Sequence, residues 1–257
     1  MILSYLRYLF LAKNQHSLHS PFLYQFYTQV LRPKKSRQNK SLIQIETTRK
    51  KMLNSAESVS VTDFGAGSRL KAGNVRKVAD IAKNAQKKPA IAKMLYRIVA
   101  FMNPKQIIDL GTSLGITTMY FAKAAPNAQI LTFEGCPNIA QLAKQNFEEN
   151  QVNNVELVIG NIDETLAKTI EKLAQIDFAF FDANHRFEPT INYFETCLPK
   201  ATESSVFIFD DIHWSADMEK AWQYIKNHPK VMISIDLFYV GIVFFRTNQP
   251  KQDFVLK

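Results

Sequence analysis

The sequence predicts an α/β protein built on a doubly wound, mostly parallel sheet, preceded by a helical N-terminal segment. From residue 106 onward, short apolar runs of strand length alternate with longer segments of helical periodicity. The glycines of Gly111-Thr112-Ser113-Leu114-Gly115 follow the first apolar run and precede a helix, as a tight strand-to-helix turn requires. Acidic residues end several of the runs, and open α/β sheets bind their ligands at such strand ends.

The expected sheet has seven strands, 106–110, 129–134, 155–159, 176–182, 204–210, 230–236 and 239–245. Helices are expected at 115–124, 137–150, 164–173, 188–197 and 215–227. Five strand–helix units are followed by two adjacent strands, which predicts a parallel sheet with a terminal antiparallel hairpin. We assign residues 105–257 to this ligand-binding domain.

Residues 1–104 form a basic, mainly helical segment. Residues 1–105 carry 20 Lys and Arg against 4 Asp and Glu, a net charge of +16, whereas residues 106–257 carry 12 against 19, a net of −7. This asymmetry fits either an anionic substrate or partner, or a solvated basic surface. Asp63 to Arg69 is expected as a glycine loop that leads into the accessory helices or lines the substrate entrance. Helices are expected at 2–12, 20–31, 75–85 and 90–102. Residues 32–51 are expected as an exposed basic connector, which could include a helix through Ile43.

Composition favours a globular cytoplasmic protein. The 257 residues are 46% hydrophobic with eight glycines, and the two cysteines, Cys136 and Cys197, have neither a disulfide framework nor metal-ligand spacing. The apolar stretch Met1 to Leu11 is interrupted by Arg7, is too short to span a bilayer and lacks a cleavage site for a signal peptide. We expect it to pack on the body as an amphipathic helix, rather than to lie on a membrane surface.

The second strand ends in Glu134-Gly135, and this acid predicts a site for an adenosine-containing ligand. A carboxylate at this place accepts hydrogen bonds from the ribose hydroxyls. A dinucleotide would require the tighter G-x-G-x-x-G turn, which seats a pyrophosphate on the helix N-terminus. The turn here is G-T-S-L-G, with Thr112 and Ser113 available as helix caps, and it favours S-adenosylmethionine, a ligand without phosphates.

Three further carboxylates end the fourth and fifth strands. In a parallel sheet, Asp182, Asp210 and Asp211 would meet at one edge of the cofactor cleft, where they repel one another unless a cation or protons intervene. Oxygen ligands suit Mg²⁺, Ca²⁺ or Mn²⁺. The alternative is that Asp210 and Asp211 cap the next helix while Asp182 faces solvent. His185 could serve as a general base at neutral pH, or simply be hydrogen-bonded in a loop, and His213 could do the same work less directly.

At these residues the chain resembles the class I S-adenosylmethionine-dependent methyltransferases over roughly residues 105–246. Within them it is most similar to the catechol and caffeoyl-coenzyme A type of O-methyltransferase. The H-S-L-H-S-P, D-F-G-A-G-S-R and E-G-C-P segments also resemble a group of uncharacterised bacterial methyltransferases. The resemblance implies a Rossmann-like sheet in the order 3-2-1-4-5-7-6.

The resemblance also implies roles for individual residues. Asp109, Gly111 and Gly115 would flank the methionine part of the cofactor, Glu134 would hold the ribose, and Asn161 and Asp163 would lie near the adenine. Metal-dependent members carry D-A-D-K after strand four and D-N-x-x-W after strand five. Here these segments read Asp182-Ala183-Asn184-His185 and Asp210-Asp211-Ile212-His213-Trp214. The three metal-ligand positions are thus Asp182, Asp210 and Asp211, with Asp in place of Asn at 211, and His185 replaces the catalytic lysine.

The expected function is methyl transfer from S-adenosylmethionine to the hydroxyl of a small molecule, assisted by a divalent cation if one binds. His185 and Asp182 are the expected catalytic residues, and the cofactor site is expected to comprise Asp109, Gly111, Thr112, Ser113, Gly115, Glu134, Gly135, Asn161, Asp163 and Asp182. Three alternatives stay open: an RNA methyltransferase that uses the basic segment, an NAD(P)-dependent oxidoreductase, and a non-catalytic adaptor. The sequence names neither the methyl acceptor nor the oligomeric state, for which a homodimer is one option.

Overall fold

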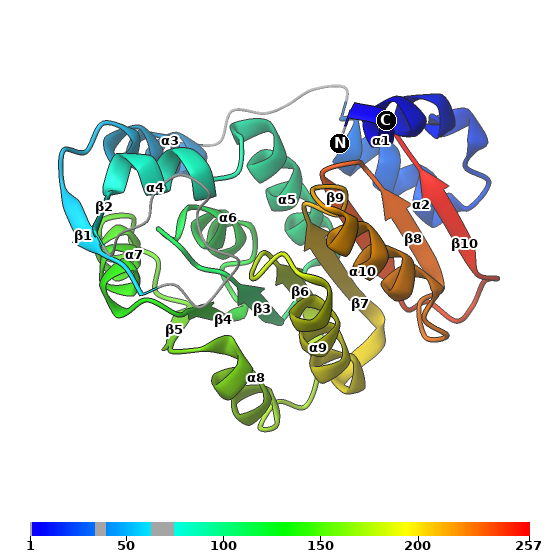
Figure 1. The fold of residues 1–257 in the computed structure, drawn as a ribbon. Coiled ribbons are helices and arrows are strands. Elements are labelled where there is room, and N and C mark those ends of the chain that lie inside the picture. The colour runs from blue at the N-terminus through cyan, green and yellow to red at the C-terminus, as the bar shows by residue number, and fades with distance from the viewer. Residues whose placement is uncertain (1, 34–39, 63–74) are drawn as a thin grey trace.

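The computed structural model describes residues 2–33, 40–62 and 75–257, and the centre of this part of the chain is an eight-stranded sheet (Figure 1). The strand order is β10-β8-β9-β7-β6-β3-β4-β5. The strands are β3 (Gln106–Leu110), β4 (Gln129–Glu134), β5 (Val155–Ile159), β6 (Ile176–Phe181), β7 (Ala201–Asp210), β8 (Ile233–Asp236), β9 (Val240–Phe244) and β10 (Gln252–Val255).

All seven predicted strands are present in the order expected for a class I methyltransferase. β9 is antiparallel to both of its neighbours, β7 and β8, and the other pairs in this sheet are parallel. The eighth strand, β10, pairs in parallel with the outer edge of β8. The sequence did not reveal it because Gln252–Val255 is short and its first two residues are exposed, so it lacks the apolar run of the inner strands.

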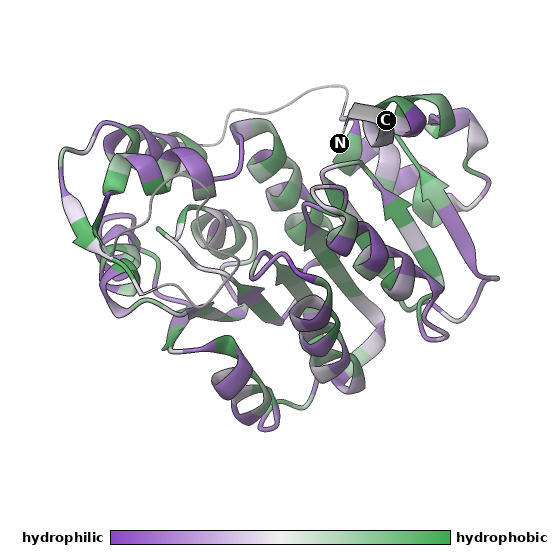
Figure 2. Ribbon diagram, in the orientation of Figure 1, coloured by the Kyte–Doolittle hydropathy of each residue, from purple (hydrophilic) through white to green (hydrophobic). Residues whose placement is uncertain are grey.

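Side chains that alternate along the strands supply two separate cores, one on each face of the sheet. One core includes Ile107, Phe178 and Ile208 and packs against α2, α3, α5, α6 and α7. The other includes Ile108, Ala179 and Phe207 and packs against α8, α9 and α10. Figure 2 shows the inner strands as largely hydrophobic, as expected for a sheet covered on both faces. The covering helices that follow the first strand are α6 (Ile116–Ala124), α7 (Pro137–Glu149), α8 (Ile162–Ile170), α9 (Phe187–Cys197) and α10 (Ala216–Asn227).

The N-terminal residues add helices and a small hairpin, and two predictions made for them were wrong. The exposed connector is wrong for residues 40–51, which belong to α3, the helix through Ile43, and bury Ile45 and Arg49 against the body. Residues 75–85 are not one helix: Val75–Lys77 is strand β2, paired with β1, and α4 begins at Val78. Asp63 to Arg69 lies outside the described residues. The elements are α1 (Ile2–Leu11), α2 (Pro21–Phe26), which continues as a π-helix (Tyr27–Leu31), α3 (Lys40–Leu53), β1 (Ser58–Ser60), β2 (Val75–Lys77), α4 (Val78–Ala85) and α5 (Pro89–Met102).

The two ends of the chain lie side by side in Figure 1. The backbone N–H of Lys13 donates to the carbonyl of Val255 at 2.8 Å, and the hydroxyl of Tyr8 donates to the carbonyl of Leu256 at 2.5 Å. Helix α1 therefore packs beside the last strand. Among the described helices, none has the length and apolar character needed to cross a membrane.

Candidate active site

The glycine turn after β3 is built around the backbone of the loop after β6. Gly111 has a φ of +103°, and a Cβ atom placed on it would lie 2.2 Å from the carbonyl oxygen of Asp182. The backbone N–H of Asp182 in turn donates to the carbonyl of Leu110 at 2.9 Å. Only glycine allows this approach, because any side chain would collide with the Asp182 carbonyl. The turn thus brings the cofactor corner and the Asp182 loop into direct contact.

Glu134 braces the glycine turn through its carboxylate. Its Oε2 accepts from the backbone N–H of Ser113 at 2.8 Å, and its Oε1 accepts from that of Cys136 at 2.9 Å. The expectation that Thr112 or Ser113 caps the helix was wrong, since α6 has Gly115 at its N-cap and no side-chain cap. Ser113 instead has a φ of 48°, a left-handed conformation that turns its N–H toward Glu134.

A cavity of about 120 Å³ opens beside this turn. Its volume is below the roughly 300–1,000 Å³ of pockets that enclose a drug-sized ligand, so it fits only part of a nucleoside cofactor. Each carboxylate oxygen of Glu134 has a second lone pair, so both can accept from ribose hydroxyls while they hold the two N–H groups. The walls include four predicted cofactor residues, Gly111, Glu134, Gly135 and Asn161, and also Phe133, Ile162, Ala183, Asn184 and Tyr193.

The end of β5 contributes a helix cap to the site, and α9 contributes a buried phenol. The side chain of Asn161 accepts from the backbone N–H of Asp163 at 3.1 Å and caps α8. Asp163 does not line the cavity; its Oδ1 accepts from the hydroxyl of Tyr193 at 2.8 Å. Burial and the bond to Asp163 raise the pKa of Tyr193 above its ordinary value. The sequence did not single out Tyr193, because an aromatic residue inside a helix is usually a core residue.

Asp109 is buried beneath the glycine turn. Its Oδ2 accepts from the hydroxyl of Thr118 at 2.5 Å and from that of Thr132 at 2.8 Å. Its Oδ1 is buried and has no hydrogen-bond partner among the described residues. Burial raises the pKa of Asp109 to about 6, although the two threonine bonds oppose the shift. A carboxyl group with one unsatisfied oxygen beside the turn is compatible with the predicted place of Asp109 beside the methionine part of the cofactor.

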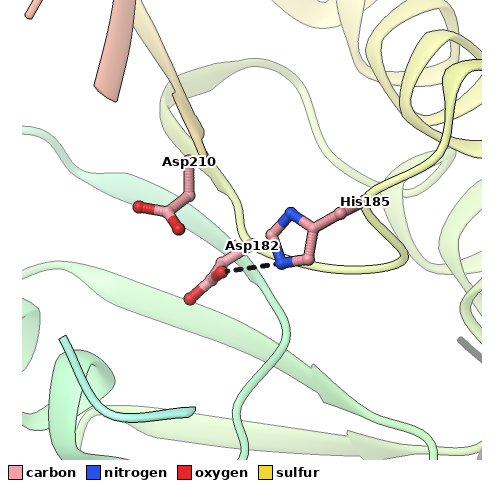
Figure 3. A group of neighbouring side chains, drawn as sticks. All are labelled: Asp182, His185 and Asp210. Carbon is pink, nitrogen blue, oxygen red and sulfur yellow. Dashed lines mark ion pairs between the residues drawn. The ribbon is translucent and has the colours of Figure 1, made fainter. Parts of the chain in front are cut away.

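The carboxylates of Asp182 and Asp210 converge at the ends of β6 and β7, together with His185 (Figure 3). His185 Nε2 lies 3.5 Å from Asp182 Oδ1, and both nitrogens lie on the side of the ring that faces the carboxylates. The side chains are largely shielded from water, with exposed fractions of 21% for His185, 11% for Asp182 and 2% for Asp210. The structure therefore brings together the two predicted catalytic residues, Asp182 and His185, and two of the three predicted metal ligands, Asp182 and Asp210.

Lys87 inserts its ammonium between the same two carboxylates. Its Nζ lies 2.9 Å from Asp182 Oδ1 and makes a second, shorter contact with Asp210 Oδ2. Lys87 was not predicted as a site residue, because it lies in the basic N-terminal segment, 95 positions before Asp182. The only sequence signal is the excess of basic residues in that segment, and this excess does not distinguish one lysine from another.

Burial and mutual charge set the pKa values in this cluster. Burial raises the pKa of Asp182 to about 6 against the opposing charge of Lys87. Burial, assisted by the charge of Asp182, also raises the pKa of Asp210 to about 6. Burial alone would lower the pKa of Lys87, but the nearby carboxylates outweigh it and raise the pKa, so Lys87 stays cationic. Burial lowers the pKa of His185, which is therefore a neutral imidazole at pH 7.

The remaining predicted site residues lie at the margin of this cluster. Asp211 does not join the grouping of Asp182, His185 and Asp210 whose ligand atoms lie within 4.8 Å of one another. It has a φ of 54°, and burial raises its pKa. His213 Nε2 lies 2.7 Å from Asp236 Oδ2, and its ring stacks on Phe238, so it fastens the β7 loop to β8.

Comparisons with known proteins agree with this geometry. Residues 108–212 match a family model described as a methyltransferase domain. A catechol O-methyltransferase of Niastella koreensis is 27% identical over 127 residues, which are 48% of this chain and 57% of the relative. The chain thus spans little more than half the length of that curated relative.

Two solved structures are similar over most of their length. The O-methyltransferase from Bacillus cereus, in complex with SAH, has a TM-score of 0.58 at 19% identity and covers 86% of this chain and 96% of its own. The SAH-bound methyltransferase PaMTH1 of Podospora anserina has a TM-score of 0.60 at 15% identity, with coverages of 82% and 90%. At these identities the shared property is the fold. Residues 108–212 are therefore similar in sequence to a methyltransferase domain, and the chain has the class I methyltransferase fold.

Proposed function

We propose that the protein transfers the methyl group of S-adenosylmethionine to the hydroxyl oxygen of a small molecule. One observation carries this proposal. The cavity lined by Glu134 and Gly111 extends to Ala183 and Asn184, the two residues that join Asp182 to His185. A cofactor whose ribose contacts Glu134 would therefore have its reactive end near the carboxylate and imidazole cluster.

The comparisons support methyl transfer over the other readings. The matched domain model and the similar proteins are methyltransferases, and the curated relative is named a catechol O-methyltransferase, which favours an oxygen acceptor. An NAD(P)-dependent oxidoreductase would need a pyrophosphate seat, and the G-T-S-L-G turn does not have the tight glycine spacing that such a seat requires. Both cysteines are buried and free, in keeping with the expected cytoplasmic location.

The chain's own groups can carry the proton chemistry. When bound, the cofactor supplies a sulfonium methyl group: its S–C bond breaks with the electron pair left on sulfur while an O–C bond forms. Neutral His185 can direct Nε2–H toward Asp182 and accept the hydroxyl proton of the acceptor at Nδ1. Asp182 would then stabilise the imidazolium that forms. Holding the reactants in line is expected to supply much of the rate.

Cofactor binding is the first test. Calorimetric titration of the full chain with S-adenosylhomocysteine is expected to give a micromolar Kd and weaker binding of NADH. Glu134→Gln should weaken S-adenosylhomocysteine binding by about tenfold to a hundredfold, because a charged acceptor for the ribose hydroxyls is lost. The matched control, Glu148→Gln, changes an exposed glutamate on α7 and should leave Kd unchanged. A folded protein that binds NADH but not S-adenosylhomocysteine would overturn the proposal.

The role of His185 has a separate test. With a hydroxyl acceptor found by screening for transfer of labelled methyl groups, His185→Ala should lower kcat by about 10²–10⁴-fold, the usual contribution of a general base. Binding of S-adenosylhomocysteine should persist, because His185 does not line the cofactor cavity. His19→Ala, which changes an exposed histidine, serves as the control. Unchanged turnover in His185→Ala would assign proton removal to another group.

The RNA alternative depends on the basic N-terminal segment. Two of its cations, Lys87 and Arg49, are buried and paired within the protein, so part of the charge excess does not face a partner. RNA binding that weakens steeply with salt would revive this alternative. A non-catalytic adaptor would bind S-adenosylhomocysteine but would transfer no methyl group to any component of a cell extract.

A further inference from the structure

The cation that a carboxylate cluster requires is already present at this site as part of the chain. Lys87 Nζ contacts Asp182 Oδ1 and Asp210 Oδ2, the two carboxylates that end β6 and β7. A divalent ion held by the same two groups would lie about 2.0–2.6 Å from their oxygens. The ammonium and the ion would compete for one position, so these residues, as arranged, do not fit a metal ion.

Contacts of the backbone at Lys87 and of the residues that follow it hold this lysine in place. Its side chain is only 12% exposed. Its backbone carbonyl accepts from Arg49 Nη1 at 2.5 Å, which ties the start of α5 to α3. Two residues later, Pro89 occupies the first turn of α5, and proline favours the extended conformation that Lys88 adopts, with ψ at 144°. To admit a metal ion, the protein would have to expel an anchored, shielded ammonium from two carboxylates.

Arg49 itself belongs to a wider set of contacts. Its Nε donates to Glu46 Oε1 at 3.0 Å, and the hydroxyl of Tyr120 donates to the same oxygen at 2.5 Å. Tyr120 lies on α6, the helix that begins at the glycine turn. Three elements, α3, α5 and α6, therefore fix the position of Lys87 relative to the cofactor corner.

We propose that Lys87 is the cation of the acceptor site: its ammonium pairs with Asp182 and Asp210 and binds the acceptor hydroxyl, in place of a divalent metal ion. An ammonium has three N–H donors. Within residues 2–33, 40–62 and 75–257, two of them have partners, which leaves one for the acceptor oxygen. As His185 removes the proton, that donor stabilises the negative charge that develops on the oxygen.

The test measures metal binding directly and needs no known acceptor, although the proposal rests on the methyltransferase function. Mn²⁺ is titrated into the full chain saturated with S-adenosylhomocysteine, and free Mn²⁺ is followed by electron paramagnetic resonance. Wild type, Lys87→Arg and the exposed control Lys88→Ala should bind no stoichiometric Mn²⁺. Lys87→Ala should gain one Mn²⁺ site, with an affinity at least tenfold higher than that of wild type, and adding Asp210→Asn should remove the site.

One result would overturn the proposal: stoichiometric Mn²⁺ binding by the wild type that Asp210→Asn abolishes. That outcome would make the carboxylates a metal site from which Lys87 is displaced. If Lys87→Ala does not fold, the comparison of wild type with Asp210→Asn still decides the question. The S-adenosylhomocysteine isotherm of the same samples reports on the cofactor separately, so failure of the proposed function and failure of the role of Lys87 are distinguishable.

Discussion

Asp109 shows how one buried carboxyl group can couple the stability of the protein to pH. Its pKa is raised from 3.8 to about 6, because burial disfavours the charged form more than Thr118 and Thr132 favour it. A group whose pKa is raised on folding stabilises the protein below its unfolded pKa, and this stabilisation is lost as the pH rises through the folded pKa. Asp109 should therefore weaken folding between about pH 4 and pH 7.

Asp109→Asn is expected to remove this dependence. The quantity to compare is the free energy of unfolding of the variant minus that of wild type. This difference should be about 2–3 kcal/mol larger at pH 7.5 than at pH 4, which is the equivalent of a shift of about two pKa units. Urea unfolding at both pH values measures the difference. Asp217→Asn, at an exposed position on α10, should show no such change. A constant difference between Asp109→Asn and wild type would mean that Asp109 has a similar pKa in both states.

At the scale of elements, α3 acts as a brace for the active site. From this helix, Arg49 donates hydrogen bonds to the loop between α4 and α5, where it contacts the carbonyl of Lys87 and the side chain of Gln86. These contacts place α3 against the loop that carries Lys87. Arg49 therefore has a structural role in the basic segment, which the net charge of that segment did not indicate.

Removing the Arg49 side chain should lower the stability of the protein and loosen the loop that carries Lys87. Arg49→Ala is expected to lower the free energy of unfolding by about 1.5–3 kcal/mol, the range for hydrogen bonds to charged groups. Lys50→Ala, its exposed neighbour on α3, should stay within about 0.5 kcal/mol of wild type. Amide hydrogen exchange at Lys87 and Lys88 should accelerate in Arg49→Ala alone. Equal stability and exchange in the two variants would contradict a bracing role.

At the scale of the whole molecule, the inner strands of the sheet and its edge strand β10 differ in how the sequence encodes them. The inner strands are apolar on both faces and were readily predicted from their composition. The outer strand β10 is half exposed, and its pairing with β8 is accompanied by contacts between the chain ends, at Lys13 and Val255. The local periodicity of the sequence cannot predict the pairing of β10 with β8, because residues far away in the chain stabilise this pairing.

The sequence by itself determined the fold class, the seven strands from β3 to β9 and the corner formed by Gly111 and Glu134, while the order of the strands was implied by the resemblance to class I methyltransferases. The strands and the corner follow from short-range patterns: apolar runs of strand length, a glycine where the backbone approaches another segment, and an acid at a strand end. Only the tertiary structure decided which cation meets the acidic strand ends. Lys87 lies 95 and 123 positions from its two carboxylate partners, and the packing of α3, α5 and α6 brings them together. Charge attraction acts through space, so spacing along the chain could not predict this contact.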